Sequence, residues 1–319
     1  MRALVVEQPG GPQAMRLRQL PAPRPGPDQV VVAVEAAGVN PVDAHNRADP
    51  GWAGVRPPYV VGYEVAGHIE AVGDGDRSAG WTRGDPVWGL LSVRGTRWGT
   101  YAELVALDAA LVGQRPPSLS AVQAASLPLA GATAVQLLDR LDPKPGEWVL
   151  VHGAAGGVGS LLVQLARARG ARVVASASAQ RQALLRDLGT EVFLDRHAGD
   201  VAERACRTIG QELDMVADLV GHGTLASSLP MVREGGRAGS IVELAGDLEL
   251  AVDRNITLHG VLMRPSREVL EVLAAAVAGG LLRPVVDQVL DLADAAAAHR
   301  RVESGRGQGK VVLHVAGWT

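Results

Sequence analysis

The chain has 319 residues, which is long for one compact core and sufficient for two domains. Apolar residues make up 47% and charged residues 20%, and the formal net charge of −3 comes without a basic block, so nucleic acid is not an expected partner. No segment approaches the ~20 uninterrupted apolar residues that span a bilayer, so no membrane partner is expected and the cytoplasm is the expected location.

The first 120 residues predict a β-domain. The segment 1–7 is expected to form a first strand rather than a signal peptide, because Glu7 and Pro9 interrupt its apolar run. Short alternating runs at 29–36 and 67–73 are bounded by Gly, Pro and Asp turns, a pattern typical of a compact barrel.

From residue 121 the pattern changes to helices alternating with apolar strands, which predicts a parallel sheet. Ser120 is placed to cap a helix that begins at Ala121. Further elements are expected as helices at 131–138 and 160–168 and as strands at 172–176, 191–194, 213–220, 236–242 and 256–262. The last part of the chain predicts a helix, a strand, a helix around 293–303, and a closing strand at 310–315 that rejoins the sheet of the first domain.

A glycine turn joins an apolar strand that starts at Val149 to the helix at 160–168. Residues without a β-carbon let backbone amides approach a pyrophosphate, and the first helical turn presents N–H groups at the positive end of a dipole. The strand at 172–176 then arrives at the spacing of a dinucleotide-binding βαβ unit. We therefore predict dinucleotide binding, with a purely structural turn as the alternative, by Gly153, Ala154, Ala155, Gly156, Gly157, Val158 and Gly159.

The end of the 172–176 strand favours NADPH over NADH. An NAD-type unit carries a carboxylate there for the ribose hydroxyls, but this chain has no acid until Asp187. The hydroxyls of Ser176 and Ser178 and the guanidinium of Arg181 suit a 2′-phosphate, and Arg196 is placed to close the same pocket. The alternative is that both arginines are solvated surface charges.

The sequence predicts no metal site. Cys206 is the single cysteine and is expected to pack as a small apolar residue, and the eight histidines show no paired spacing.

Several segments in order resemble the zinc-free quinone oxidoreductase branch, the zeta-crystallin-like branch, of the medium-chain dehydrogenase/reductase superfamily. The matching segments are 38–43, 61–67, 84–89, 99–103, 127–134, the glycine turn and 309–313. The resemblance covers the whole chain and implies an α/β fold in which a GroES-like barrel-type catalytic domain (1–120 and 264–319) is combined with a doubly wound Rossmann domain (121–263). It also implies NADPH as the cofactor and a homodimer, typically joined through edge strands of the Rossmann sheets.

The chain departs from the zinc-dependent relatives at their metal ligands, because it has Asn40-Pro41-Val42-Asp43 and Tyr63 where those enzymes carry a Cys and a His. Alcohol oxidation needs a Lewis acid to hold an alkoxide. Hydride reduction of a quinone or conjugated enone needs only orientation, exclusion of water and a donor to the oxygen that gains charge.

Candidate catalytic residues come from these segments. The Asn40 amide is expected to donate to the substrate or the nicotinamide amide, Asp43 to order a water or a neighbour, and Tyr63 to donate its phenolic proton. The alternatives are a turn residue, a helix cap and a packed aromatic, respectively. Arg47 is expected to balance Asp43 or reach a substrate carbonyl, and Trp52 to stack on the substrate or to pack.

Four further residues are expected near the cofactor: Thr133 at its nicotinamide end, Val220 and Gly221 beside a ribose, and Lys310 at a phosphate. The expected function is NADPH-dependent hydride transfer to a small-molecule quinone or related activated alkene. The alternatives are an enoyl or 2-enal reductase, or an NADPH-binding protein with little turnover, such as a sensor or crystallin-type protein.

Overall fold

The computed structural model describes residues 1–315, and the last four residues of the expected catalytic domain, 316–319, lie outside the described residues. The described chain divides into two units. The first comprises residues 1–132, 264–280 and the segment from Pro284 onward, and the second comprises 133–263 with 281–283. Among the described residues, no helix is long and apolar enough to cross a bilayer.

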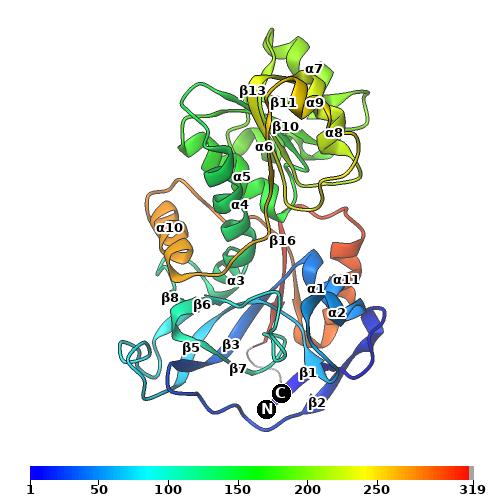
Figure 1. Cartoon of the computed structure of the whole chain (residues 1–319). Helices are drawn as coiled ribbons and strands as arrows, with labels where there is room; N and C mark the ends of the chain where they lie inside the picture. Colours follow the sequence, from blue (N-terminus) through cyan, green and yellow to red (C-terminus); the bar gives the residue numbers. More distant parts are fainter. Residues whose placement is uncertain (316–319) are drawn as a thin grey trace. The chain divides into compact units, whose positions relative to one another are not determined.

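The first unit is organised around one long, largely buried strand, β3 (Gln29–Val39). β3 pairs antiparallel with β5 (Glu64–Val72). It also pairs antiparallel with β7 (Leu104–Asp108) and with β16 (Lys310–His314). The sheet continues through β6 (Pro86–Leu90) and β8 (Val112–Gln114) at one end and through β15 (Val286–Asp291) at the other. The pairing of β16 with β3 confirms that the closing strand rejoins the first sheet (Figure 1).

A second, three-stranded sheet of this unit contains β1 (Arg2–Val6), β2 (Met15–Gln19) and β4 (Tyr59–Val60), which confirms the expected first strand. The helices of the unit are α1 (Pro41–Ala48), α2 (Pro50–Ala53), α3 (Ala121–Ala125), α10 (Arg267–Ala278), α11 (Ala295–Glu303) and the start of α4 (Pro128–Leu141). α3 packs on β3 and β5. The first unit therefore continues beyond residue 120, where the sequence places a boundary.

The second unit holds a parallel sheet in the order β11-β10-β9-β12-β13-β14. When the strands of this unit are numbered in chain order, the sheet order is 3-2-1-4-5-6, which is the doubly wound order. The strands are β9 (Trp148–His152), β10 (Arg172–Ala177), β11 (Val192–Asp195), β12 (Leu213–Asp218), β13 (Val232–Ser240) and β14 (Thr257–Gly260). The helices are α5 (Gly157–Ala168), α6 (Gln182–Asp187), α7 (Val201–Ile209), α8 (Thr224–Ser228) and α9 (Leu250–Asp253).

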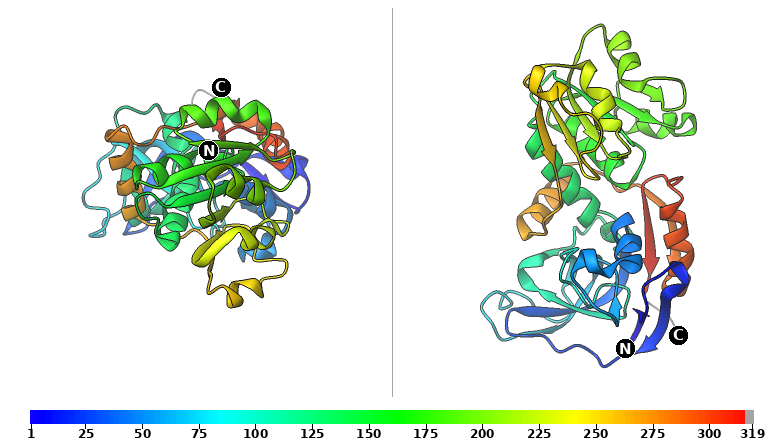
Figure 2. Two further views of the ribbon diagram at one scale, coloured as in Figure 1. Left: turned by 90° about the horizontal axis from the view of Figure 1, so that it is seen from above. Right: turned by 45° about the vertical axis from the view of Figure 1, so that its right-hand side comes forward.

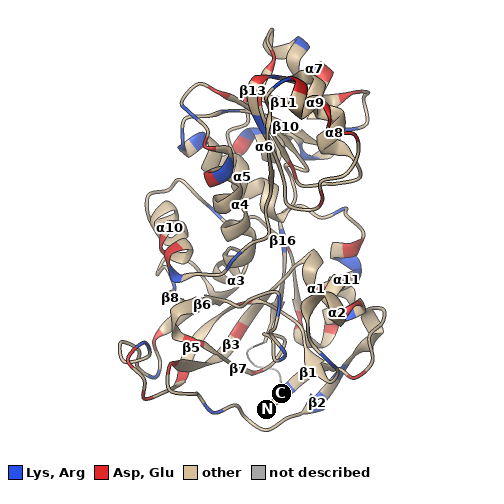
Figure 3. Ribbon diagram, viewed as in Figure 1, with Lys and Arg blue, Asp and Glu red and all other residues tan. Residues whose placement is uncertain are grey.

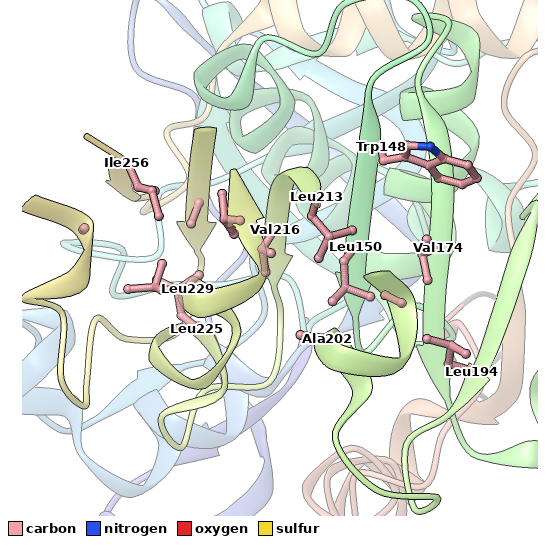
Figure 4. Close-up of a cluster of buried hydrophobic side chains, with 14 residues drawn as sticks. Trp148, Leu150, Val174, Leu194, Ala202, Leu213, Val216, Leu225, Leu229 and Ile256 are labelled. Atoms are coloured by element: carbon pink, nitrogen blue, oxygen red, sulfur yellow. The ribbon is translucent and has the colours of Figure 1, made fainter. Parts of the chain in front are cut away.

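Helices cover both faces of this sheet, with α5 on one face and α7 and α8 on the other (Figures 1 and 2). On the second face, Leu150, Val174 and Val216 from adjacent strands pack under Leu225 and Leu229 (Figure 4). Burial on both faces explains why the central strand β9 is apolar and buried from Trp148 to Val151.

Several predicted element boundaries are wrong, and two of them have a clear physical reason. α5 begins at Gly157, inside the glycine turn, because glycines there can take helical geometry close to the strand. β12 ends at Asp218 rather than at Val220, because the Asp218 carboxylate accepts hydrogen bonds from the amides of Val220 and Gly221 and turns the chain.

Candidate active site

The backbone of the glycine turn fits a dinucleotide pyrophosphate. Gly153 has a φ of +73°, a left-handed conformation that favours glycine. A β-carbon at Gly159 would collide with the carbonyl oxygen of Gly153, so the close contact between turn and helix requires glycine. The N-cap residue of α5, Gly156, has no side chain to engage the first N–H groups of the helix, which leaves them to an anionic ligand.

The other predicted turn residues differ in accessibility. Ala154 and Ala155 are buried below the turn, while Gly157 and Val158 are half-buried at the start of α5. The amide of Ala154 donates to the carbonyl oxygen of Ser176 at 3.1 Å, which fixes the turn to the neighbouring strand β10.

The residues predicted to bind a 2′-phosphate lie at the ends of two paired strands. β10 and β11 run in parallel, and the Arg196 amide donates to the carbonyl oxygen of Ala177 at 2.9 Å. Ser178 follows β10 and is half-buried, as is Arg181 in the short helical turn after it. Arg196 is exposed, with its Nε 3.0 Å from Nε2 of His197. Ser176 is buried within the sheet, so Ser178 is the more accessible of the two hydroxyls.

The loop after β12 is held by an acid that the sequence analysis missed. The Asp218 carboxylate accepts from the amides of Val220 and Gly221 at 2.9 and 3.1 Å, and Gly221 has a φ of +79°. In the neighbouring strand, Nε2 of His152 lies 2.9 Å from Oγ of Ser228, and burial lowers the pKa of the imidazole. An acid after three apolar residues at a strand end was the available signal for Asp218. Thr133 is buried in α4, at the first residue of the second unit.

Asn40 belongs to a buried, hydrogen-bonded group in the first unit. It precedes Pro41 at the start of α1, and its Oδ1 accepts from Nζ of Lys310. Its Nδ2 donates to Oε1 of Glu64 at 2.8 Å, and Lys310 also donates to Oε1 at 2.6 Å. The second Glu64 oxygen accepts from the amide of Leu129, in the first turn of α4. These contacts fix the plane of the Asn40 amide and use one of its two N–H donors.

Lys310 is therefore placed differently from the prediction that it reaches a cofactor phosphate. Its ammonium is buried and donates to Asn40, to Glu64 and, at 3.1 Å, to the carbonyl oxygen of Val39. All three of its donors are used within the first unit. A lysine at the start of a strand gives no local signal that its charge is buried; its partner Glu64 lies 246 residues away in the sequence.

A second buried chain of hydrogen bonds ends on Asp43. Oδ2 of Asp43 accepts from the Asn40 amide at 2.7 Å and from the Tyr101 hydroxyl at 3.1 Å. The Tyr101 oxygen lies 3.2 Å from Nε2 of His299, and Nδ1 of His299 lies 2.8 Å from Nη1 of Arg47. Because a guanidinium only donates, Nδ1 must accept and the His299 proton must sit on Nε2. Each bond in the chain therefore donates toward Asp43.

Burial shapes the protonation of this chain. Desolvation is the main cause that raises the pKa of Asp43 from 3.8 to about 7, against the opposing effect of its hydrogen bonds. Oδ1 of Asp43 is buried and has no hydrogen-bond partner among the described residues. Burial, assisted by the charge of Arg47, lowers the pKa of His299 to about 3, so the imidazole is neutral.

Arg47 does not reach a substrate carbonyl, which corrects one of its two predicted roles. Nη2 pairs with Glu303 at 2.7 Å, Nε donates to the carbonyl oxygen of Gly10 at 2.9 Å, and Nη1 contacts His299. The side chain is buried, and its link to Asp43 runs through His299 and Tyr101.

Tyr63 is a packed aromatic residue, which was the alternative to its predicted role as an accessible proton donor. The residue is 1% exposed, its hydroxyl lies 2.6 Å from Nδ2 of Asn46, and burial raises its pKa. Nδ2 of Asn46 also donates to the carbonyl oxygen of Val93 at 2.9 Å. The pair therefore connects α1 to the loop after β6.

Trp52 is half-buried in α2, and its ring already has two neighbours. The guanidinium of Arg94 lies 4.4 Å from the ring centroid, and the imidazole of His45 meets the indole edge-on at 5.2 Å. Arg94 is a further residue of this surface that the sequence analysis did not single out.

Two hollows open on the first unit, and neither is lined by Asn40 or Asp43. The larger, about 670 Å³, lies along β7 and is lined mainly by apolar residues such as Leu104 and Leu107. The smaller, about 470 Å³, lies between α2 and the loop after β6. Among residues 1–315, no group of three or more His, Cys, Asp or Glu side chains is arranged to hold a metal ion.

Two family models match the chain: an alcohol dehydrogenase GroES-like domain at residues 26–117 and a zinc-binding dehydrogenase at 188–313. A quinone oxidoreductase of Sus scrofa is 33% identical, covering 98% of this chain and 97% of that protein. An NADPH-dependent alkenal/one oxidoreductase, chloroplastic, of Arabidopsis thaliana is 32% identical, covering 98% of this chain and 79% of that protein.

Among solved structures, an NAD-dependent alcohol dehydrogenase matches with a TM-score of 0.92 at 32% identity, covering 99% of this chain and all of that chain. The sheet order of the second unit and the full-length similarity agree on one family. The chain belongs to the quinone oxidoreductase-like branch of the medium-chain dehydrogenase/reductase superfamily and is an oxidoreductase that binds a nicotinamide cofactor.

Proposed function

We propose that this protein is an NADPH-dependent reductase that transfers a hydride to a quinone or a related activated alkene without a catalytic metal. The observation that carries the proposal is the fixed Asn40 amide, whose second N–H is not used by Glu64. When bound, the nicotinamide supplies the hydride. The oxygen of the acceptor gains negative charge in this reaction, and in this proposal the second N–H of Asn40 donates to it, with solvent as the source of the final proton.

The surrounding residues act by holding Asn40 in place. Lys310 and Glu64 fix its side chain, while Asp43 accepts from its backbone amide. A donor that is oriented before the substrate binds needs no reorganisation as charge develops, which is the main way a protein lowers such a barrier. Asp43 is thus a positioning residue in this proposal.

NADPH is favoured by the strand ends in the second unit. No carboxylate lies in the sequence between the end of β10 at Ala177 and Asp187, while Ser178, Arg181 and Arg196 gather where β10 and β11 end. The relative from Arabidopsis thaliana is NADPH-dependent by name, and the matching solved alcohol dehydrogenase is NAD-dependent by name. The two cofactors therefore have to be compared directly.

Arg181→Ala is expected to weaken NADPH binding by roughly tenfold and to leave NADH binding nearly unchanged, because only NADPH carries the 2′-phosphate. Arg186→Ala removes an exposed arginine of the adjacent α6 and is the matched control. Equal losses for both cofactors in Arg181→Ala would refute the phosphate assignment.

An alkenal or enone reductase is the second candidate, supported by the similarity to the Arabidopsis protein. Purified protein with NADPH and either a naphthoquinone or a 2-enal, followed at 340 nm, separates the two. NADPH binding without oxidation by any acceptor would instead indicate a binding protein with little turnover.

We also propose a homodimer that forms through β14, the last strand of the second sheet. Val242, Leu244 and Leu262, near that edge, are between 46% and 56% exposed, which is unusual for large apolar side chains. Light scattering should give twice the mass of the chain, and Leu244→Glu with Leu262→Glu should convert the dimer to monomer. A monomeric unmodified protein would overturn this part of the proposal.

A further inference from the structure

The smaller hollow of the first unit has a cationic lining. It holds about 470 Å³ and is lined by Gly54, Val55, Arg56, Gly95 and Arg97. Arg94 borders it, adjacent to Gly95 in the chain and stacked on Trp52 of α2. No acidic residue is among those that line the hollow.

The walls of the hollow are pinned to the rest of the unit. The loop after β6 is held at its start by the Leu91 amide, which donates to the carbonyl oxygen of Tyr63 at 2.7 Å. Its middle is held by Asn46, which donates to Val93, and by the Gly95 amide, which donates to the carbonyl oxygen of Ala53 at 2.7 Å. The spacing of the two walls is therefore set before any ligand arrives.

Two of the arginines lie over indole rings. The guanidinium of Arg94 lies 4.4 Å from the ring centroid of Trp52, and that of Arg97 lies 4.9 Å from that of Trp98. Nε of Arg97 also donates to the carbonyl oxygen of Pro58 at 2.9 Å. A stacked guanidinium still presents N–H donors in its own plane, and less side-chain entropy is lost when it binds an anion.

These guanidinium groups have no counter-charge. Within residues 1–315, none of Arg56, Arg94 and Arg97 has a carboxylate oxygen within 4.0 Å, whereas Arg115 and Arg301, for example, pair with acids. The acids nearby along the chain have other partners: Glu103 pairs with Arg2, and Asp49 accepts from the amide of Gly51 at the start of α2. The protein carries a net charge of −3 and acids and bases are mixed over both units (Figure 3), so this local excess of positive charge is not part of a generally basic surface.

We propose that this hollow binds an anionic group, a carboxylate, sulfonate or phosphate, carried by the acceptor itself. Arg56 and Arg97 are the anion ligands, and Arg94 lies over the ring of Trp52 at the border of the hollow. A planar fork of donors suits the oxygens of each of these groups. The inference rests on the proposed reductase function and names the class of acceptor: a quinone or activated alkene with a negatively charged substituent.

The test compares 1,2-naphthoquinone with 1,2-naphthoquinone-4-sulfonate as acceptors for the full-length protein. In Arg56→Gln/Arg97→Gln, the KM of the sulfonate should rise roughly tenfold while kcat and the KM of the neutral quinone change less than about twofold. Arg56→Lys/Arg97→Lys keeps both charges and should restore most of the affinity. Arg83→Gln removes an exposed arginine that pairs with Glu70 and should change neither KM.

Inorganic sulfate distinguishes the source of the anion. If the acceptor supplies it, sulfate competes with the sulfonated quinone and leaves the neutral quinone unaffected. Inhibition or activation of both reactions by sulfate would instead assign the hollow to a free anion, and equal KM changes for both acceptors in the Gln variant would also overturn the proposal.

Binding measured without turnover keeps this inference separate from the proposed function. Quenching of tryptophan fluorescence by naphthalene-1-sulfonate, with naphthalene as the neutral probe, measures binding, and the comparison with Arg56→Gln/Arg97→Gln assigns it to the hollow. Failure to reduce 1,2-naphthoquinone would reject the reductase, while loss of sulfonate binding in Arg56→Gln/Arg97→Gln would still support the anion site. If the unmodified protein and Arg56→Gln/Arg97→Gln bind naphthalene-1-sulfonate equally well, the anion site is rejected. The proposed reductase function is not affected by that result.

Discussion

Replacing Asp43 with Asn should remove a pH dependence from the stability of the protein. Asp43 is completely buried and burial raises its pKa from 3.8 to about 7. An unfolded chain releases this proton near pH 4, whereas the folded protein keeps it until about pH 7. The favourable contribution of Asp43 protonation to the free energy of unfolding is therefore fully present below pH 3.8 and is lost as the pH rises through about 7.

The size of the effect follows from the shift in pKa. A difference of roughly 3 units corresponds to about 4 kcal/mol over the full range, of which about 2–3 kcal/mol falls between pH 5 and pH 7.5. In Asp43→Asn the amide oxygen can still accept from Asn40 and Tyr101, and the new NH₂ takes the place of the unbonded Oδ1. The new NH₂ lowers the free energy of unfolding by an amount that does not change with pH.

Urea unfolding at pH 5 and pH 7.5, followed by tryptophan fluorescence, measures the difference in free energy of unfolding between the two proteins. Between pH 5 and pH 7.5, the free energy of unfolding of Asp43→Asn should rise by about 2–3 kcal/mol relative to that of the unmodified protein. Asp49→Asn removes an exposed acid of the same unit and should show no such trend. A difference between Asp43→Asn and the unmodified protein that is constant with pH, or that changes in the opposite direction, would refute the reasoning.

Three further substitutions test the packing around the site. Lys310→Met should lower the free energy of unfolding, measured with urea, by about 3–5 kcal/mol because Glu64 keeps a buried, unpaired charge. Adding Glu64→Gln should recover much of this loss. A double variant that is no more stable than Lys310→Met would contradict this reasoning. Gly38→Ala should lose about 2 kcal/mol or more, since its β-carbon would collide with Glu64, whereas Gly80→Ala has open space and should match the unmodified protein in thermal unfolding. His299→Leu removes one hydrogen bond from each of two buried partners, Arg47 and Tyr101, and should cost about 2–4 kcal/mol, with a smaller cost for His299→Gln; equal melting temperatures for the two variants would show that the hydrogen bonds do not matter.

The second unit could be predicted largely from local patterns. β9 and β10 contain uninterrupted apolar runs, and the glycine turn stands where β9 leads into α5, so a parallel sheet with a ligand at one edge follows from the sequence. The errors were confined to element ends. There the competing interactions were a side chain that bonds the following amides, as at Asp218, and glycines that enter the helix early.

The hydrogen-bond partners in the first unit were not predictable in the same way. Asn40 and Asp43 stand in a recognisable segment, but the groups that hold them, Glu64, Tyr101 and His299, come from distant parts of the chain. Sequence alone determined which residue types start α1 and that a dinucleotide turn is present. Only the tertiary structure decided that Lys310 is buried on Glu64 rather than exposed to a phosphate, because a buried charge is stable only where packing brings an opposite charge and enough hydrogen bonds to it.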